Sequence, residues 1–338
     1  MSAKKRIAFF DSKPYDKEFF GKYKDQYDLD ITFFDGKLNP ENAKLAAGYD
    51  GAVAFVNCNI SAEAIDVLVE GGVKVLGMRC AGFDAVDLKH AKGKLRVFRV
   101  PAYSPNAVAE HAMSLLMCLN RKLHRAYNRV RDFDFRISGF TGMDLTGKTV
   151  GVIGTGKIGQ VFIRICNGLG MNVIAFDPYP VNEELRKELK ITYVSLDELF
   201  TQADVISLHS PLTPETRHII KKENIDQMKD GVIIINAGRG GLVDGAALLE
   251  GIKSGKVGAA GIDVYENEQP FFYEDRSGEV IDDEVLVGLL SYPNVLVTAH
   301  QAFLTEEALF AISNVTLGNL SNFFNGVESP DTEVVYQG

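Results

Sequence analysis

Short apolar runs rich in β-branched residues recur along the N-terminal third of the chain, and polar segments with helical spacing separate them. Runs of this kind are typical of strands that are buried on both faces of a parallel sheet. The pattern predicts strands at 6–10, 30–34, 51–56, 73–78 and 96–100, and helices at 12–27, at 39–47 and from Ser61. Strands that alternate with helices at this rhythm favour a small flavodoxin-like domain.

Two prolines, Pro101 and Pro105, interrupt the alternation after the last of these strands. Proline stops both strands and helices, so this segment is a natural domain boundary. A long helix is predicted from Asn106 past Leu119, and its apolar stripe is so wide that it belongs in a core or in a dimer face. The basic segment 121–136 is interpreted as a solvated or interface helix.

The alternation resumes at Thr149 and continues almost to the C-terminus. The apolar runs predict strands at 149–153, 172–176, 192–194, 205–208, 232–236, 259–264 and 295–298. The segments between them predict helices at 160–169, 183–189, 223–228 and 246–254, and one more that opens with a capping box at Ser195. A final amphipathic helix, 305–324, is long enough to return to the first domain.

A glycine-rich turn stands at the centre of this second half. Gly154, Gly156 and Gly159 follow the strand 149–153 with the spacing G-x-G-x-x-G, and Asp177 ends the next strand. This is the context of a dinucleotide-binding βαβ unit, in which the glycines allow a tight turn, a close pyrophosphate and a closely packed helix. Asp177 would accept hydrogen bonds from ribose hydroxyls and repel a 2′-phosphate, which predicts NAD rather than NADP. A structural glycine turn is the alternative.

We therefore expect an α/β protein with two domains. Residues 102–299 would form an NAD-binding domain around a Rossmann-type doubly wound parallel sheet. Residues 1–101 and 300–338 would form a smaller, discontinuous substrate domain with a flavodoxin-like α/β fold. The chain would then cross twice between the domains, near Pro101 and Ala299, with a cleft between them.

Composition narrows the choice of partners and compartment. The formal net charge of −9 and the pI near 5.3 argue against a nucleic acid or an anionic membrane as a partner. No apolar run is long enough to span a membrane, and the charged start leads directly into a strand rather than a secretory signal. The cysteines show no metal-ligand spacing and are interpreted as reduced core thiols of a cytoplasmic protein without a metal site; they are Cys58, Cys80, Cys118 and Cys166.

Polar residues follow several strands of the second domain. Arg239 comes after the strand 232–236, and the planar fork of arginine can pair with a carboxylate. His300 comes after the strand 295–298 and could donate a proton to a carbonyl oxygen. Since parallel strands end at one edge of a sheet, we expect both side chains there, with His209 lining the cofactor loop. A surface arginine and a structural histidine are the alternatives.

Three acids lie near the end of the strand 259–264, and spacing alone does not assign their roles. Asp263, still on the strand, would point at the nicotinamide. Glu266 or Glu268 could reach a nitrogen of His300 and keep its ring protonated. A cation, a proton donor and an orienting carboxylate are what the reduction of a keto acid needs.

Longer motifs extend over the whole chain. They are RCAGF at 79–83, VPAY at 100–103, AEHA at 109–112, GTGKIG at 154–159, DPYP at 177–180, DVYENE at 263–268 and HQAFLT at 300–305. With these motifs the chain resembles the D-isomer-specific 2-hydroxyacid dehydrogenases, and most closely their fermentative D-lactate dehydrogenase branch. The acidic, aromatic insertion that begins at Phe271 also resembles that branch rather than the phosphoglycerate or formate dehydrogenases.

This resemblance implies an NADH-dependent, reversible reduction of pyruvate to D-lactate. It implies that Arg239 holds the substrate and that His300, with Glu268 as its partner, donates the proton. It also implies a homodimer or a dimer of dimers.

The resemblance further implies a set of binding residues. The N–H groups of Ala81 and Gly82 would help to bind the substrate carboxylate, and Tyr103 and Phe303 would shape the pocket. The implied cofactor contacts, besides the three glycines of the turn and His209, are Lys157, Ile158, Asp177, Ser210, Pro211, Thr216, Ala237, Gly238 and Asp263.

Some positions depart from the family pattern. Many relatives have Thr-Ser where this chain has Ala237 and Gly238, so a hydroxyl contact to the cofactor would be missing. Many have proline in place of Ala299, and close relatives have Asn-Asn in place of Asp84 and Ala85. An acid at Asp84 near a carboxylate site would alter affinity or substrate choice.

Two other functions stay open at this point. One is a broader reductase of 2-keto acids with longer side chains. The other is an NAD-sensing binding protein without enzymatic activity, as in the C-terminal-binding-protein corepressors that share this fold. The complete set of Arg239, Glu268 and His300 favours an enzyme, and the acidic composition without a basic patch disfavours the corepressor.

Overall fold

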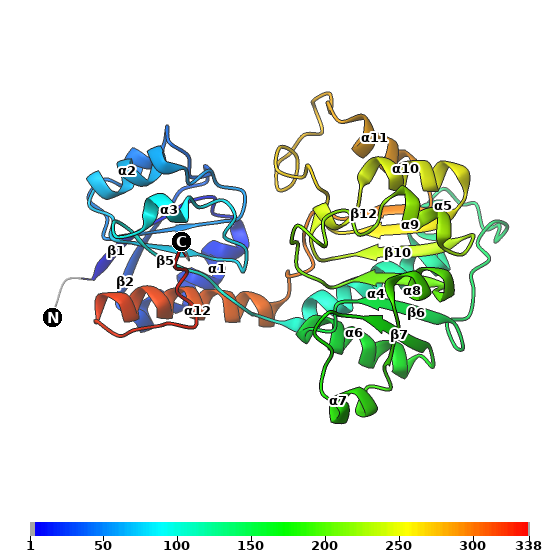
Figure 1. Ribbon diagram of the computed structural model, residues 1–338. Coiled ribbons are helices and arrows are strands. Elements are labelled where there is room, and N and C mark those ends of the chain that lie inside the picture. The colour runs from blue at the N-terminus through cyan, green and yellow to red at the C-terminus, as the bar shows by residue number, and fades with distance from the viewer. Residues whose placement is uncertain (1–3, 337–338) are drawn as a thin grey trace. The chain divides into compact units, whose positions relative to one another are not determined.

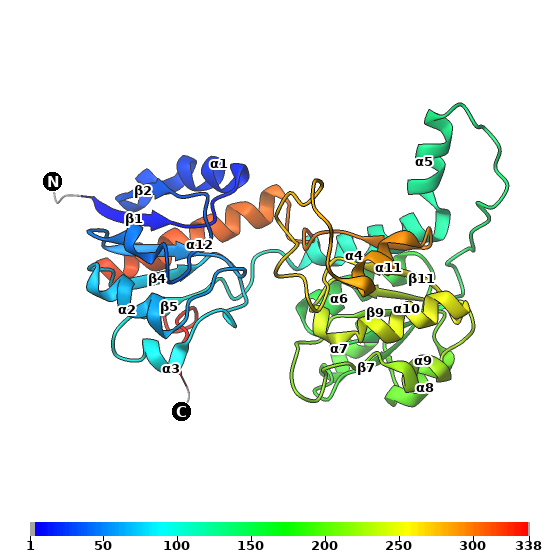
Figure 2. The ribbon, with the colours of Figure 1, turned by 90° about the horizontal axis from the view of Figure 1, so that it is seen from above.

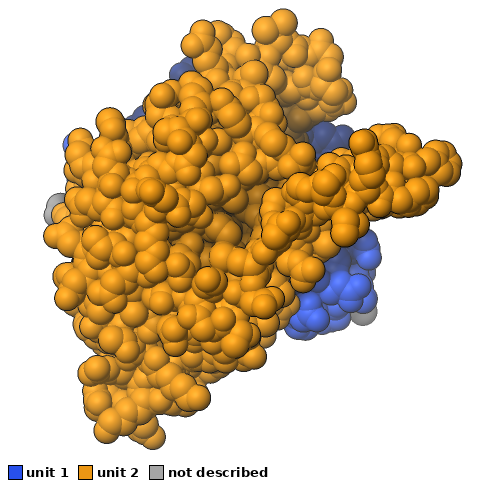
Figure 3. Space-filling view, turned by 90° about the vertical axis from the view of Figure 1, so that its right-hand side faces the viewer, with its two compact units in different colours: residues 1–104, 304–338 blue, residues 105–303 orange. Residues whose placement is uncertain are grey.

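The computed structural model describes residues 4–336. The chain forms two compact units, which Figure 3 distinguishes by colour. Unit 1 holds the residues up to Ser104 and those from Leu304 onward, and unit 2 holds Pro105–Phe303. Each unit is built around one sheet with helices beside it (Figure 1). The predicted α/β fold class is confirmed.

Unit 1 contains a five-stranded parallel sheet in the order β2-β1-β3-β4-β5, the flavodoxin-like order. Its strands are β1 (Lys5–Phe9), β2 (Leu29–Phe33), β3 (Gly51–Ala54), β4 (Val75–Met78) and β5 (Arg96–Phe98). Its α-helices are α1 (Pro14–Tyr23), α2 (Ala62–Glu70), α3 (Leu88–Ala91) and α12 (Glu306–Phe324), and 3₁₀ turns cover Lys24–Tyr27 and Ala43–Ala46.

Helix α12 brings the C-terminal part of the chain back onto the sheet of unit 1. The hydroxyl of Thr305 caps its first turn by accepting a hydrogen bond from the N–H of Ala308 (3.2 Å). The helix lies against β4 at Gly77, where a Cβ would stand only 3.2 Å from the Thr316 methyl group. The missing side chain therefore allows the helix to approach the sheet closely.

Unit 2 contains a seven-stranded parallel sheet in the order β12-β11-β10-β9-β6-β7-β8, the doubly wound order of a Rossmann domain. Its strands are β6 (Thr149–Ile153), β7 (Asn172–Phe176), β8 (Thr192–Tyr193), β9 (Val205–Leu208), β10 (Val232–Asn236), β11 (Val257–Ile262) and β12 (Val295–Val297). Its α-helices are α4 (Pro105–Arg121), α5 (Leu123–Arg131), α6 (Lys157–Gly168), α7 (Glu183–Glu188), α8 (Leu196–Gln202), α9 (Lys222–Gln227), α10 (Gly245–Ser254) and α11 (Glu284–Ser291), with a 3₁₀ turn at Gly240–Leu242. Within residues 4–336, no helix combines the length and the apolar character needed to cross a membrane.

The units divide a few residues after the predicted boundaries at 101/102 and 299/300. Residues 300–303 belong to unit 2 because their backbone is bonded to Asp263. The N–H of His300 donates to the carbonyl oxygen of Asp263 (2.7 Å), and the N–H of Ala302 donates to its carboxylate (2.9 Å).

Several predicted helices have other bounds in the structure. The segment 39–47 forms only a 3₁₀ turn, because the side chains of Asn39 and Asn42 accept hydrogen bonds from each other's backbone N–H and compete with a helix. In the basic segment 121–136, Arg121 ends α4, and the only further helix is α5. Helix α6 starts at Lys157 rather than at residue 160, directly after the glycine turn. Helices α3 and α11 were not predicted.

Candidate active site

The predicted site residues of unit 2 lie in the turns and helix starts that follow the carboxyl ends of its strands. They are Gly154, Gly156, Lys157, Ile158, Gly159, Asp177, His209, Ser210, Pro211, Thr216, Ala237, Gly238, Arg239, Asp263, Glu268, His300 and Phe303. Open parallel sheets bind their ligands at this edge. The sheet order of unit 2 therefore brings together residues that are far apart in the sequence.

The three glycines after β6 answer different spatial demands. Gly154 has a φ of +96°, and a Cβ there would stand 2.7 Å from the backbone carbon of His209. A Cβ on Gly159 would clash with the carbonyl oxygen of Gly154. Gly156, by contrast, has no described atom within 4 Å of the place of a Cβ, and it is the N-cap of α6. Its open backbone at a helix N-terminus fits the pyrophosphate of a dinucleotide.

Asp177 follows β7 and is fixed beside this turn. Its Oδ2 accepts hydrogen bonds from the N–H (2.7 Å) and the hydroxyl (3.0 Å) of Thr155, and its Oδ1 accepts one from the N–H of Tyr179 (2.8 Å). The carboxylate therefore has a defined position at the place where a βαβ unit holds the adenosine ribose.

The loop after β9 borders the glycine turn from the other side. The ring of His209 packs 4.8 Å from the ring of Phe162 on α6. The Ser210 hydroxyl is buried, and no described residue forms a hydrogen bond with it. A buried polar atom without a partner fits a site that receives a polar ligand. Further along the loop, the hydroxyl of Thr216 donates to the carbonyl oxygen of Pro211 (2.7 Å).

Arg239 lies in the turn after β10, which Asn236 shapes. The Asn236 side chain donates to the carbonyl oxygen of Arg239 (2.9 Å) and accepts from the N–H of Gly238 (3.1 Å). Gly240 comes next, and a Cβ there would clash with the backbone of Tyr265. The turn therefore packs closely against the segment after β11. The guanidinium donates to the carbonyl oxygen of Gly238 (2.9 Å), and within residues 4–336 it has no ion pair with an acid. It can thus receive an anionic ligand.

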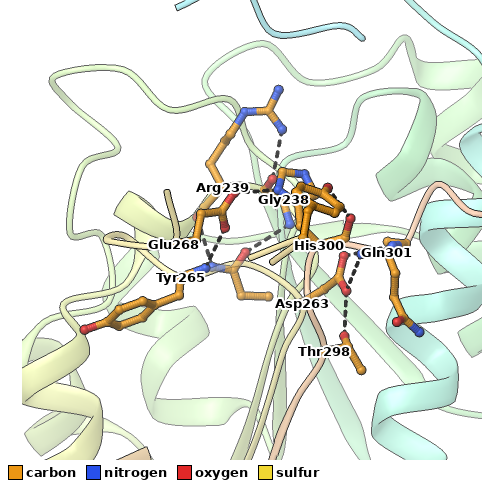
Figure 4. Close-up of polar contacts among 11 residues, drawn as sticks. Gly238, Arg239, Asp263, Tyr265, Glu268, Thr298, His300 and Gln301 are labelled. Carbon is orange, nitrogen blue, oxygen red and sulfur yellow. Dashed lines mark hydrogen bonds and ion pairs between the residues drawn. The ribbon is translucent and has the colours of Figure 1, made fainter. Parts of the chain in front are cut away.

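His300 and Glu268 form a close pair at the same edge of the sheet (Figure 4). The His300 Nδ1 lies 2.6 Å from the Glu268 Oε1, and the other carboxylate oxygen accepts from the N–H of Tyr265 (3.0 Å). Glu266, the alternative that spacing left open, instead bonds to the Nε2 of His218 (2.9 Å). Among the described residues nothing bonds to the His300 Nε2, so this atom is left to face a ligand.

Asp263 holds the loop that carries His300. The carboxylate is fully buried and accepts hydrogen bonds from the Thr298 hydroxyl (2.5 Å) and from the N–H groups of Gln301 and Ala302 (each 2.9 Å). The His111 Nε2 lies 3.3 Å from its Oδ1. Burial by itself raises the pKa of Asp263, but these hydrogen bonds outweigh burial, and the pKa lies below its ordinary value. Asp263 therefore stays ionised and ties down the loop.

Comparison with known proteins decides the family. Residues 113–302 match the family model for the D-isomer specific 2-hydroxyacid dehydrogenase, NAD binding domain. The chain is 48% identical to the D-lactate dehydrogenase of Escherichia coli (strain K12), over 96% of this chain and 99% of that protein. The chain belongs to the D-isomer specific 2-hydroxyacid dehydrogenases.

Solved structures of such dehydrogenases share the whole fold. The apo-structure of D-lactate dehydrogenase from Escherichia coli matches with a TM-score of 0.90 at 46% identity, over 98% of this chain and all of that one (100%). The pyruvate reductase of Chlamydomonas reinhardtii matches with a TM-score of 0.91 at 45% identity, over 96% of this chain and 98% of that one. The family resemblance seen in the motifs is confirmed, and the dehydrogenase is an NAD-dependent oxidoreductase.

In unit 1 of the dehydrogenase, the predicted substrate residues Ala81 and Gly82 lie in the loop after β4. The Arg99 guanidinium donates to the carbonyl oxygen of Ala81 (3.1 Å), and the Cys80 thiol donates to that of Gly82 (3.2 Å). Both carbonyl groups are thereby tied inside the unit. Tyr103 lies near the end of this part of unit 1 and is half-buried.

Two of the residues that hold Asp263 were not predicted from the sequence. They are His111, which lies on α4, and Thr298, the last residue of the predicted strand 295–298. The imidazole of His111 on the wide apolar stripe of α4 was the one available signal, since a polar group on such a face needs a partner. In the structure it bonds to the Thr298 hydroxyl (3.1 Å) as well as to Asp263.

The half-buried histidine of the cofactor loop predicts a pH effect on the stability of the dehydrogenase. Burial lowers the pKa of His209 to about 4, whereas an unfolded chain protonates it near 6.5. The unfolded state then binds more protons between these values, so this group contributes stability above pH 6.5 that is lost as the pH falls toward 4. The loss amounts to at most about 3 kcal/mol.

The measurement is urea unfolding of the parent and of His209→Gln at several pH values between 4 and 7. Glutamine keeps an amide that can bond to the hydroxyl of Ser207, as the His209 Nε2 does (2.9 Å). Burial raises the pKa of Asp16 to about 6, so the contribution of that group to stability increases as the pH falls, opposite to the contribution of His209. Subtracting the unfolding free energy of the variant from that of the parent at each pH removes the Asp16 contribution and isolates His209. Parallel stability curves for parent and variant would contradict the prediction.

Proposed function

We propose that the dehydrogenase reduces pyruvate to D-lactate with NADH, reversibly. The observation that carries this proposal is the grouping of Arg239, Glu268 and His300 at one edge of the sheet of unit 2, with the His300 Nδ1 2.6 Å from the Glu268 carboxylate. The names of two similar proteins, a D-lactate dehydrogenase and a pyruvate reductase, support pyruvate as the substrate.

NADH, when bound, supplies the hydride that adds to the keto carbon. We assign to Arg239 the substrate carboxylate, because its guanidinium has no ion pair among the described residues and can form two parallel hydrogen bonds. His300 would donate the proton from Nε2 to the carbonyl oxygen, which becomes the hydroxyl of the product. Glu268 would hold Nδ1, orient the ring and stabilise its protonated form.

The roles of the remaining predicted residues belong to the same proposal. We propose that unit 1 is the substrate domain, and that the N–H groups of Ala81 and Gly82 bind the substrate carboxylate while Tyr103 and Phe303 shape the pocket. On unit 2, the cofactor would contact the glycine turn, Lys157, Ile158, Asp177, the loop from His209 to Thr216, Ala237, Gly238 and Asp263.

One set of assays tests the proposed function. NADH oxidation is followed with pyruvate, oxaloacetate, phenylpyruvate, hydroxypyruvate and glyoxylate, and the product from pyruvate is resolved on a chiral column. Highest kcat/KM for pyruvate with D-lactate as the product supports the proposal. Preference for a longer keto acid would favour the broader reductase, and tight NADH binding without turnover would favour a sensing protein.

The charge at Asp177 predicts cofactor selectivity. We expect Asp177→Asn to lower the ratio of kcat/KM for NADH to that for NADPH by about tenfold, because a carboxylate repels a 2′-phosphate and an amide does not. Asparagine keeps an acceptor oxygen for the N–H of Thr155. Steady-state kinetics with both cofactors measure the ratio, and Asp226→Asn, which removes an exposed acid from α9, is the matched control. An unchanged ratio would refute the role of Asp177.

We also propose a homodimer of a cytoplasmic protein. Helix α5 and the loop 132–142 form an arm that stands out from unit 2 (Figures 2 and 3). The arm exposes large apolar side chains, among them Phe133 (83%) and Ile137 (85%), and such surfaces mark contacts with other chains. Helix α4, by contrast, packs its apolar face against α6, β10 and β11 of unit 2, and its other face is exposed. All four cysteines are free thiols, which suits a reducing compartment, and sedimentation equilibrium would measure the oligomeric state.

A further inference from the structure

The backbone of His300 has an unusual conformation. Its φ is +51°, in the left-handed region that residues with a side chain seldom occupy. Tyr273, in the aromatic insertion after β11, is also left-handed, with a φ of +66°. The Tyr273 hydroxyl donates a hydrogen bond to the carbonyl oxygen of His300 (2.6 Å). Strained backbone of this kind persists only where surrounding contacts hold it, and it gathers at functional sites.

Tyr273, which bonds to the carbonyl oxygen of His300, comes from the same short segment as Glu268. The N–H groups of Phe271 (3.0 Å) and Phe272 (2.9 Å) both donate to the carbonyl oxygen of Glu268, so the chain folds back on itself in a turn. Phe272 is only 6% exposed and anchors this turn in the core of unit 2. The turn therefore fixes the position of Tyr273 in space relative to Glu268.

Both ends of this segment hold His300. Glu268 bonds to the ring at Nδ1, and Tyr273 bonds to the backbone at the carbonyl oxygen. The N–H of His300 donates to the carbonyl oxygen of Asp263 (2.7 Å). These contacts leave the Nε2 as the polar atom of His300 to which no described residue bonds.

We propose that Tyr273 is a positioning residue, which fixes the peptide of His300 and thereby aims the Nε2 at the substrate carbonyl. The inference rests on the proposed function, in which His300 donates the proton. Asp263 restrains both peptides of His300 at their N–H groups, because its carbonyl oxygen accepts from His300 and its carboxylate accepts from Gln301. Tyr273 adds the bond to the carbonyl oxygen of the peptide between His300 and Gln301. Without this hydroxyl the peptide between His300 and Gln301 is held only at its N–H, by the Asp263 carboxylate, and it can tilt about that contact and relieve the left-handed strain. The ring would then turn away from the direction that proton transfer requires.

The test compares Tyr273→Phe with Tyr27→Phe. Phenylalanine keeps the aromatic ring and its packing and removes only the hydroxyl. Tyr27 is the matched control, because its hydroxyl donates a hydrogen bond of similar length to Asn314 (2.9 Å), and both residues belong to unit 1 rather than to the loop of His300. For each protein one measures kcat and KM for pyruvate, the Kd of NADH by fluorescence, the melting temperature, and the isotope effect on kcat with NADH deuterated at the transferred position.

We expect Tyr273→Phe to lower kcat by about tenfold, because a small misplacement of a catalytic group slows chemistry strongly. KM and the Kd of NADH should stay within about twofold of the parent, and a primary isotope effect should be expressed on kcat, since the slowed step is the chemical one. Tyr27→Phe should keep the kinetics of the parent. This pattern separates positioning from a structural role, which would move the melting temperature without the isotope effect.

Other results would overturn the inference. They are a kcat for Tyr273→Phe equal to that of the parent, a loss confined to KM or to NADH binding, an equal loss in both tyrosine variants, and failure of Tyr273→Phe to fold. A parent protein that reduces none of the 2-keto acids would instead overturn the proposed function, whatever the variants do. The two failures are therefore distinguishable.

Discussion

Replacing His300 by glutamine is expected to lower kcat for pyruvate reduction by about a thousandfold, with little change in the Kd of NADH. Glutamine is of similar size and polarity, but it cannot transfer a proton at neutral pH. The hydride would then have to reach a carbonyl whose oxygen receives no proton from the protein. NADH binding should persist, because the glycine turn and Asp177 lie on other loops of unit 2 than His300.

Stopped-flow and steady-state kinetics measure this loss, and NADH fluorescence measures binding. His90→Gln is the matched control, because His90 lies on α3 in unit 1 and pairs with Asp66 there (2.8 Å). The control should keep the parent's kcat. If His300→Gln retained a tenth or more of the parent's rate, another group would have to supply the proton.

Replacing Arg239 should give the second large effect. We expect Arg239→Gln to lower kcat/KM for pyruvate by about a thousandfold, with contributions from both a higher KM and a lower kcat, because the guanidinium would bind the carboxylate and polarise the carbonyl. Arg239→Lys should lose less but remain well below the parent, since lysine restores the charge without the planar fork. NADH binding should change little in both variants.

The order of activity, with arginine above lysine and lysine above glutamine, is the decisive reading. Arg164→Gln serves as the control, because Arg164 is an exposed residue of α6 paired with Glu188 (3.1 Å). Equal rates for the lysine and glutamine variants would mean that charge at residue 239 does not bind the substrate. A loss of NADH binding in step with activity would move Arg239 from the substrate to the cofactor.

The sheets were predictable because their strands are buried runs of β-branched residues between glycine and proline signals. β10, with the sequence VIIIN, is buried along its whole length. Helix bounds were less predictable, because side-chain hydrogen bonds decide them. At Asn39 and Asn42 the two amide side chains hold a turn where the apolar spacing favours a helix.

The site was predictable to the level of residue types but not of pairing. Glu266 and Glu268 both follow β11 within a few residues, and the sequence alone did not show which of them pairs with His300. The turn after β11 directs Glu266 to His218 and Glu268 to His300. The contact of Tyr273 with His300 was equally hidden, because its geometry depends on a fold-back within the insertion that no local pattern encodes.

Gly240 couples the turn of Arg239, proposed to bind the substrate, to the segment of Glu268, proposed to hold the proton donor. Any side chain there would collide with the Tyr265 backbone, so the turn that carries Arg239 lies in direct contact with the segment between β11 and Glu268. Redesigning the turn of Arg239 for a bulkier substrate would therefore also displace Glu268, the proposed partner of His300. Under the proposal that unit 1 is the substrate domain, new specificity is better sought in its loops, because Gly240, Glu268 and His300 all belong to unit 2.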